Sequence, residues 1–213
     1  MKKLISIFAS LLITFAASAT DFVEGQHYVK FADKPSDEPK VTEFFSFYCG
    51  HCFAFEPLAK TLKANSQLAD FKFEKSHVDF LPMAEKDQQF MLSKALVIAE
   101  NLDRPDIIDE IFKQIHVTKD VPENVSDVAL IFSKAGISSD KFNDLFESFT
   151  VIQKAQEMVE AQAYFNQAGV LKGVPTFIVN EQYVVRPEGF KGIKTYDEFF
   201  QKVEELTTYL LRK

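Results

Sequence analysis

Two cysteines separated by two residues are the strongest chemical feature of this chain. Cys49 and Cys52 are the only cysteines in 213 residues, and Gly50 and His51 lie between them. Such a pair can exchange a disulfide with another thiol, or it can supply half of a structural zinc site. The zinc alternative needs two more Cys or His ligands, and no two of the four histidines lie at ligand spacing. Disulfide exchange is therefore the favoured chemistry.

The residues around the two cysteines predict a strand followed by a helix. Residues 41–48 are aromatic and β-branched and end directly at Cys49, which is typical of a buried strand. From Cys52 onward apolar residues recur at helical spacing, and Pro57 is expected to kink this helix without ending it. The motif should therefore lie at a strand-to-helix turn.

A cysteine at such a turn is activated by the helix that follows it. Free backbone N–H groups and the positive end of the helix dipole would favour the thiolate of Cys49, the form that attacks and leaves in exchange. His51 can add a charge or a hydrogen bond, although an inert, exposed histidine at the helix start is the alternative. A stabilised thiolate favours the dithiol, so the corresponding disulfide would be a strong oxidant.

A single acidic residue, Glu43, lies inside the predicted strand. The strand period places it on the same face as Val41, Phe45 and Phe47. A buried carboxylate needs a partner or a raised pKa, whereas a solvated edge position would need neither.

The rest of the chain suggests two strand-rich parts that flank a helical block. A second strand is expected at 71–80, a hairpin at 176–179 and 183–185, and an amphipathic helix at 195–212 with Thr195 and Glu198 at capping-box spacing. Between them, apolar residues at helical spacing predict helices at 90–98, at 107–115 behind Pro105, at 128–132 behind Ser126, and at 142–149, with Gly136 as a helix stop. This order predicts an inserted helical domain.

The N-terminus resembles a targeting segment. Lys2 and Lys3 precede a 14-residue apolar run, and residues 17–19 fit the small-x-small cleavage pattern, so residues 1–19 are expected to be a signal peptide cleaved after Ala19. A membrane anchor is the alternative, but the run is shorter than the roughly 18 to 20 apolar residues that span a bilayer. Export would place the cysteines where disulfides persist.

The composition of the chain argues against one large class of function, nucleic-acid binding. The chain has a formal charge of −7, with 24 basic and 31 acidic residues, which argues against binding to a phosphate backbone. It is 46% hydrophobic with 23 Phe and no Trp, so it can bury a phenylalanine-rich core.

Three segments together resemble the DsbA family of exported bacterial thiol:disulfide oxidoreductases, within the thioredoxin superfamily. They are EFFSFYCGHC at 43–52, EKSHVDF at 74–80 and GVPTFIVN at 173–180, and the resemblance extends from about residue 28 to the end. It implies an α/β, thioredoxin-like fold with an inserted all-helical domain. Residues 20–81 and 163–213 would form the thioredoxin-like domain, and residues 82–162 the insert.

The resemblance also implies roles for particular residues. Cys49 would be the exposed nucleophile and Cys52 its buried partner. Glu43 would be the buried acid beneath the active site, with Lys75 from the next strand near it, and it could relay the proton of Cys52.

Substrate contacts are implied in the same way. Pro175 would be a cis-proline beside the cysteines, which would leave the Val174 backbone free to pair with an extended substrate. A trans proline that simply starts a strand is the alternative. Gly50 is also expected to face the substrate.

One residue departs from the family pattern. Family members typically have proline at the position of Gly50, and Gly-His is also the pair of the protein disulfide isomerases. An isomerase or a reductase of the same fold is therefore an alternative, although the chain has no obvious dimerisation module. A peptide-binding chaperone with a phenylalanine-lined groove, which would not need the cysteines, is another.

The function that follows is a periplasmic oxidase. It would donate the Cys49–Cys52 disulfide to newly exported, unfolded polypeptides with free cysteines, through a mixed disulfide at Cys49. No bound cofactor and no metal are expected. The protein would act as a monomer, and a quinone-linked membrane partner of the DsbB type would reoxidise it.

Overall fold

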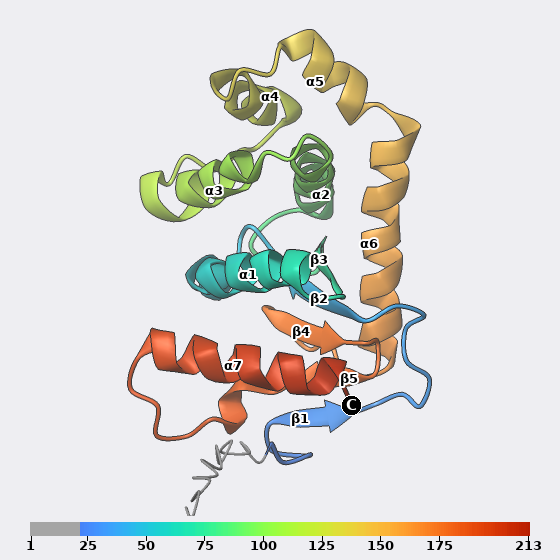
Figure 1. Ribbon diagram of the computed structural model, residues 1–213. Coiled ribbons are helices and arrows are strands. Elements are labelled where there is room, and N and C mark those ends of the chain that lie inside the picture. The colour runs from blue at the N-terminus through green and yellow to red at the C-terminus, as the bar shows by residue number, and fades with distance from the viewer. Residues whose placement is uncertain (1–21) are drawn as a thin grey trace, which may run out of the picture.

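A five-stranded mixed sheet forms the centre of the molecule. The computed structural model describes residues 22–213, so the predicted signal peptide and its cleavage site after Ala19 lie outside the described residues. The strand order is β1-β5-β4-β2-β3 (Figure 1). The strands are β1 (Tyr28–Lys30), β2 (Lys40–Phe45), β3 (Lys72–His77), β4 (Thr176–Val179) and β5 (Tyr183–Val185). Only β2 and β3 pair in parallel, because the long helix that connects them returns the chain to the same end of the sheet.

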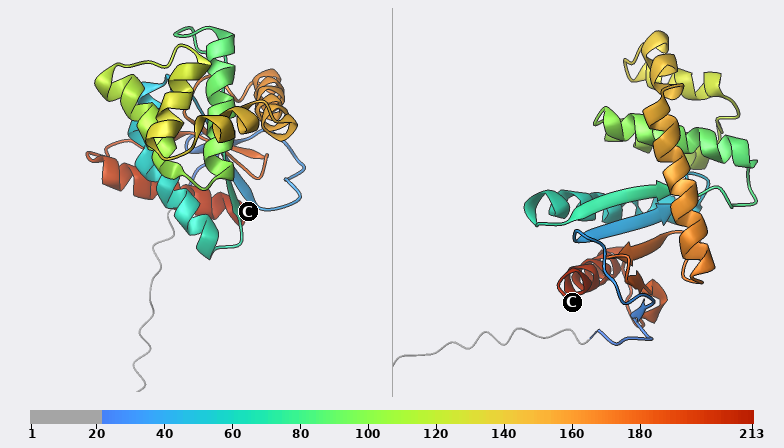
Figure 2. Two further views of the ribbon diagram at one scale, coloured as in Figure 1. Left: turned by 90° about the horizontal axis from the view of Figure 1, so that it is seen from above. Right: turned by 90° about the vertical axis from the view of Figure 1, so that its right-hand side faces the viewer.

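Two helices cover one face of this sheet, and a third packs on the other. α1 (Gly50–Leu68) and α7 (Tyr196–Leu211) bury Leu58, Leu62 and Leu206 against the sheet. On the opposite face, Phe165 near the end of α6 (Phe149–Gln167) packs against Phe44 from β2. The sheet is therefore covered on both faces (Figure 2).

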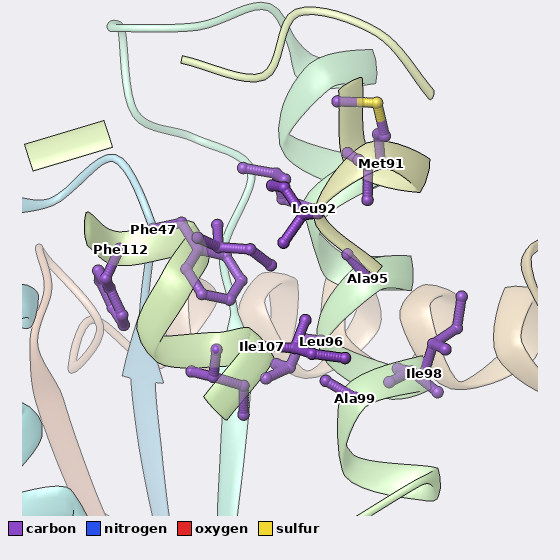
Figure 3. Packing of buried hydrophobic residues seen from close by; sticks show 14 of the residues in the cluster. Phe47, Met91, Leu92, Ala95, Leu96, Ile98, Ala99, Ile107 and Phe112 are labelled. Carbon is purple, nitrogen blue, oxygen red and sulfur yellow. The ribbon is translucent and has the colours of Figure 1, made fainter. Parts of the chain in front are cut away.

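The helical block lies beyond the β3 edge of the sheet (Figures 1 and 2). It consists of α2 (Lys86–Asn101), α3 (Pro105–Lys113), α4 (Val125–Lys134), α5 (Ser139–Phe146) and the first part of α6. A five-residue π-helix, η1 (Gln114–Thr118), continues α3 and was not predicted, and a 3₁₀ turn, η2 (Pro187–Gly189), follows β5. Figure 3 shows Phe47, from the loop after β2, packed among side chains of α2 and α3. The loop before the cysteines is thus part of the core of the helical block.

Several predicted elements match the structure. Both hairpin strands have the predicted bounds, and α1 runs through Pro57 without ending. The Glu198 backbone N–H donates to the Thr195 hydroxyl at 3.2 Å, which caps α7. Gly136 has a φ of 85° just after α4, a left-handed conformation in which glycine carries no steric cost, so it ends that helix as predicted.

Other predicted boundaries were wrong. β2 ends at Phe45 and not at Tyr48, because the next residues turn, with the Cys49 N–H donating to the Ser46 carbonyl at 3.0 Å. β3 ends at His77, three residues before the predicted Phe80.

The helix boundaries after β3 also differ. Asn124, and not Ser126, caps α4, because its side chain accepts from the first free N–H groups. Phe149 does not end α5: Ser148 caps a new helix there, and this α6 continues to Gln167, past the predicted end of the insert. No helix among residues 22–213 is long and apolar enough to cross a membrane.

Candidate active site

Cys49 is the N-cap residue of α1. Its backbone is extended, with φ −89° and ψ 112°, and the Cys52 N–H donates to its Sγ at 3.1 Å. Four N–H groups at a helix start have no partner within the helix, and here the sulfur of Cys49 satisfies one of them. The predicted strand-to-helix turn is therefore present, with a three-residue loop between strand and nucleophile.

This position makes Cys49 acidic and Cys52 inert. The pKa of Cys49 is lowered to about 7, chiefly by the Cys52 thiol and also, against the effect of burial, by the backbone N–H groups of Cys52 and His51. Burial, the hydrogen bond to Cys49 and the charge on Cys49 raise the pKa of Cys52. The two thiols thus shift in opposite directions, as a nucleophile and its resolving partner require.

Cys49 is less exposed than expected. It is 7% exposed and Cys52 is 0% exposed, and both are free thiols. Gly50 and His51 are the exposed residues of the motif. The imidazole of His51 makes no hydrogen bond or ion pair with any described residue, so only its backbone N–H contributes to the acidity of Cys49.

The loop before β4 brings Val174 and Pro175 to the nucleophile. The Val174–Pro175 peptide bond is cis, as the resemblance implies. The Cys49 Sγ donates to the Val174 carbonyl at 3.4 Å. Residues 125 positions apart in the chain are therefore in direct contact at the site.

A buried cluster of three charges lies beneath the motif. Glu43 and Lys75 are register partners on β2 and β3, and the Lys75 Nζ lies 3.1 Å from a Glu43 carboxylate oxygen. Glu43 is fully buried and accepts no hydrogen bond from any other described residue. Burial raises its pKa to about 7, although the charge of Lys75 opposes that shift. Glu43 is therefore poised between its two protonation states at neutral pH.

The third member, Glu56, was not predicted. It follows Cys52 by four residues on α1, so it lies on the same buried face one turn further on, and it pairs with Lys75. Burial alone would lower the pKa of Lys75, but Glu43 and Glu56 outweigh it and raise that pKa. The i, i+4 spacing from Cys52 was the available signal, since it predicts a buried acid that needs a cation.

A second missed residue is His77, which supports the loop before Cys49. The Ser93 hydroxyl donates to Gln89, so it can only accept from His77 Nδ1, at 2.9 Å. The other ring nitrogen then accepts from the Ser46 hydroxyl at 3.4 Å, while that hydroxyl accepts from the Tyr48 N–H. Burial lowers the pKa of His77 to about 3, so the ring is neutral and this tautomer is fixed.

Among residues 22–213, no group of three or more His, Cys, Asp or Glu side chains could hold a metal ion.

The fold and the site together define the class of protein. A thioredoxin-like sheet, an acidic thiol at the start of a helix and a buried resolving thiol are the features of a thiol:disulfide oxidoreductase.

Comparisons with known proteins give the family. Residues 40–201 match the DSBA-like thioredoxin domain, so the chain belongs to the DsbA family. It is 31% identical to the thiol:disulfide interchange protein DsbA of Pectobacterium carotovorum, and 31% identical to that of Haemophilus influenzae, with 100% of each chain covered.

Solved structures agree with this assignment. DsbA of Klebsiella pneumoniae superposes with a TM-score of 0.77 at 24% identity, over 92% of this chain and 100% of that one. A Proteus mirabilis DsbA variant, solved with the non-covalently bound peptide PWATCDS, has a TM-score of 0.76 at 26% identity, over 91% of this chain and 100% of that one.

Proposed function

We propose that this oxidoreductase works as an oxidase that donates the Cys49–Cys52 disulfide to unfolded, newly exported polypeptides with free cysteines. The observation that carries the proposal is the opposite shift of the two thiols. A Cys49 pKa of about 7 stabilises the thiolate of the reduced form, and a disulfide has no charge that could gain from the same donors. The reduced form is therefore favoured over the oxidised form, and the disulfide is readily transferred to a substrate.

The reaction passes through a mixed disulfide at Cys49. A substrate thiolate attacks the Cys49 sulfur, and the Cys49–Cys52 bond breaks with Cys52 leaving as a thiolate that takes up a proton. A second substrate thiolate then attacks the substrate sulfur, and Cys49 leaves as a stable thiolate. The substrate loses two electrons and gains one disulfide, and the protein gains a dithiol.

The surrounding residues assist these steps. Glu43 gives a proton to Cys52 or removes one from it, because its pKa of about 7 makes both directions accessible. Lys75 supports this role by neutralising the second carboxylate, Glu56. His51 contributes its backbone N–H to the Cys49 thiolate.

Substrate binds beside the Val174–Pro175 bond. The Val174 carbonyl faces Cys49, and the regular pairing of β4 begins only at Thr176. An extended peptide can therefore pair with the Val174 backbone while its cysteine meets Cys49 and its neighbouring residues cross the exposed Gly50. The Proteus mirabilis relative was solved with a non-covalently bound peptide, which supports a peptide as the class of substrate.

We also propose a cellular setting for this activity. Cleavage after Ala19 would release the protein into the periplasm as a monomer, with residues 20–81 and 163–213 as the thioredoxin-like domain and 82–162 as the insert. A quinone-linked membrane protein of the DsbB type would reoxidise it. The exposed Gly50–His51 pair, shared with isomerases, favours disulfide isomerisation as a second activity.

Transfer to a reduced, unfolded protein tests the proposal. Oxidised wild-type protein mixed with reduced ribonuclease A should transfer one disulfide per molecule, and acid quenching should trap a covalent complex. Cys49→Ser should remove both the transfer and the complex. If the wild type instead rearranges scrambled ribonuclease A but leaves the reduced form unoxidised, the protein is an isomerase.

A further inference from the structure

A histidine of the helical block lies directly over the active-site motif. His116 belongs to η1, and its Nε2 lies 2.8 Å from the Phe47 carbonyl oxygen, 69 residues away in sequence. Its ring stacks on Phe53 with a centroid distance of 5.3 Å and an interplanar angle of 10°. A Cβ placed on Gly50 would lie 3.9 Å from the same ring. One side chain thus contacts the chain on both sides of the start of α1.

The hydrogen bond to Phe47 determines which ring nitrogen of His116 carries a hydrogen. A carbonyl oxygen only accepts, so His116 Nε2 must carry a hydrogen and donate it. That donor exists in the cation and in one neutral tautomer, so the contact does not depend on a charge.

The contacts to Phe47 and Phe53 bracket the N-cap. Phe47 lies two residues before Cys49, Gly50 is the first residue of the helix, and Phe53 is the fourth. Contacts between the residues just before a cap and the fourth helical residue fix the angle at which a chain joins a helix. Here that brace comes from outside the helix, through His116.

The angle matters because the nucleophile is the cap itself. The Cys49 sulfur is held by the Cys52 N–H at 3.1 Å, and its loop by the Cys49 N–H bond to Ser46 at 3.0 Å. His77 bonds to Ser46 in this loop, but among residues 22–213 only His116 donates a hydrogen bond to the Phe47 carbonyl. A hydrogen bond weakens steeply when its angle opens, so a small rotation of the loop would loosen the donors around the sulfur.

We propose that His116 is a positioning residue through which the helical block holds Cys49 at the N-terminus of α1 in the orientation that its thiolate needs. The inference rests on the proposed role of Cys49 as the nucleophile. It assigns the helical block a part in setting the oxidising strength of the site, besides covering it.

Three substitutions separate the donor from the ring. His116→Phe keeps a ring to stack on Phe53 but removes the donor. His116→Gln removes the ring but keeps an amide donor at nearly the same reach as Nε2, and His116→Asn is too short to reach Phe47. The matched control is His27→Phe, because His27 also stacks on a phenylalanine, Phe190, and accepts from a backbone N–H.

The readouts are the Cys49 thiolate absorbance as a function of pH and the equilibrium constant with glutathione. His116→Phe and His116→Asn should raise the Cys49 pKa and lower the equilibrium constant for oxidising glutathione by about threefold, the scale of one net hydrogen bond. His116→Gln and His27→Phe should match the wild type. Urea unfolding of each variant shows that the comparison is made on folded protein, and if the Phe variant does not fold, the Asn variant carries the test.

Two results would overturn the inference. One is that the Phe and Asn variants have the same Cys49 pKa and the same equilibrium constant with glutathione as the wild type. The other is a Gln variant that shifts as far as the Phe variant, which would mean that the imidazole itself matters and not its donor. Failure of the proposed function looks different, because Cys49 would then lack a lowered pKa in the wild type as well.

Discussion

Two regions at the start of α1 give a cysteine opposite chemistry. One is the rim of the first helical turn, where Cys49 lies, and the other is the interior beneath it, where Cys52 lies. At the rim, Cys49 meets free N–H donors and keeps 7% of its surface exposed, and its pKa is lowered to about 7. One turn further in, Cys52 is fully buried next to apolar residues, and its pKa is raised. Solvation and hydrogen bonding at the position, and not the residue type, decide whether a thiol is a nucleophile.

The interior region is not inert as a whole. Glu43 and Glu56 share one lysine there, and two carboxylates cannot both be fully stabilised by a single buried cation. Glu43 is the more deeply buried of the two, and burial raises its pKa to about 7. The rim thus stabilises the Cys49 thiolate, and the interior supplies Glu43 to exchange a proton with Cys52.

The largest expected difference between the two regions is in alkylation. The pKa of Cys49 is lowered to about 7, whereas Cys52 is buried and its pKa is raised, so Cys49 should react more than about a hundredfold faster with iodoacetamide at neutral pH. Mass spectrometry of the reduced protein after brief labelling measures both rates. Equal labelling would remove the distinction between the regions.

Removing the interior acid should affect only one step of exchange. In the reaction of the dithiol with oxidised glutathione, Cys49 attacks first, and Cys52 then displaces the bound glutathione. Glu43→Gln should slow the second step by about tenfold and leave the first nearly unchanged, since only the second needs the proton of Cys52 removed. Rapid mixing with acid quenching resolves the two steps.

The pH profile of that second step sharpens the test. Its rate in the wild type should rise as pH passes about 7, where Glu43 becomes a base, and this rise should be lost in Glu43→Gln. Glu74→Gln is the matched control, because Glu74 precedes Lys75 on β3 but pairs with Lys40 and Lys72 outside the buried cluster. A similar effect in both variants would make the role of Glu43 structural.

The rim should also make the reduced protein more stable than the oxidised protein. The Cys49 pKa falls from 9.0 to about 7 on folding, so this stabilisation is fully present above pH 9 and is lost as pH falls through about 7. The disulfide form lacks it, and closing so short a loop constrains the unfolded chain only modestly. The free energy of unfolding should therefore be higher for the reduced form by about 1 kcal/mol near pH 8, after solvent screening. This gap between the two forms should close in acid.

Urea unfolding of both redox forms between pH 5 and 9 measures this gap. Glu43 contributes the opposite dependence, since its raised pKa gives stability that is present below about pH 4.5 and lost as pH rises through about 7; burial, the largest cause of that shift, is expected to act in both redox forms. His51→Ala should narrow the gap only slightly, because the backbone N–H remains. An oxidised form that is the more stable would assign the protein to the reductases.

The smallest expected effect is at Gly50. Cys49 already has the extended backbone that a following proline requires, and proline is favoured at the first position of a helix. Neither donor to the thiolate is the Gly50 N–H, and the added Cβ would only contact His116 at 3.9 Å. Gly50→Pro should therefore stabilise both redox forms by about 0.5 kcal/mol and leave their difference unchanged. A changed difference in urea unfolding would show that Gly50 itself sets the redox balance.

Local sequence was sufficient for the nucleophile and for most elements around it. The spacing of Cys49 and Cys52, the aromatic strand before them and the apolar helix after them depend on neighbours in the chain, so periodicity and turn chemistry could predict the site. A strand period placed Glu43 on an apolar face, the family resemblance implied that it is a buried acid, and the structure buries it fully. Boundaries were less accurate, since β2 ends where Ser46 begins a turn that no hydrophobic pattern marks.

The sequence by itself thus determined which residues react, and the tertiary structure alone decided several of the residues that tune them. Glu56, His77 and His116 act through partners on other elements, and His116 contacts Phe47 across 69 residues. Nothing in a single sequence predicts such pairs, because they arise only when the helical block folds against the edge of the sheet. Desolvation likewise depends on that packing, which is why two cysteines three residues apart have opposite chemistry.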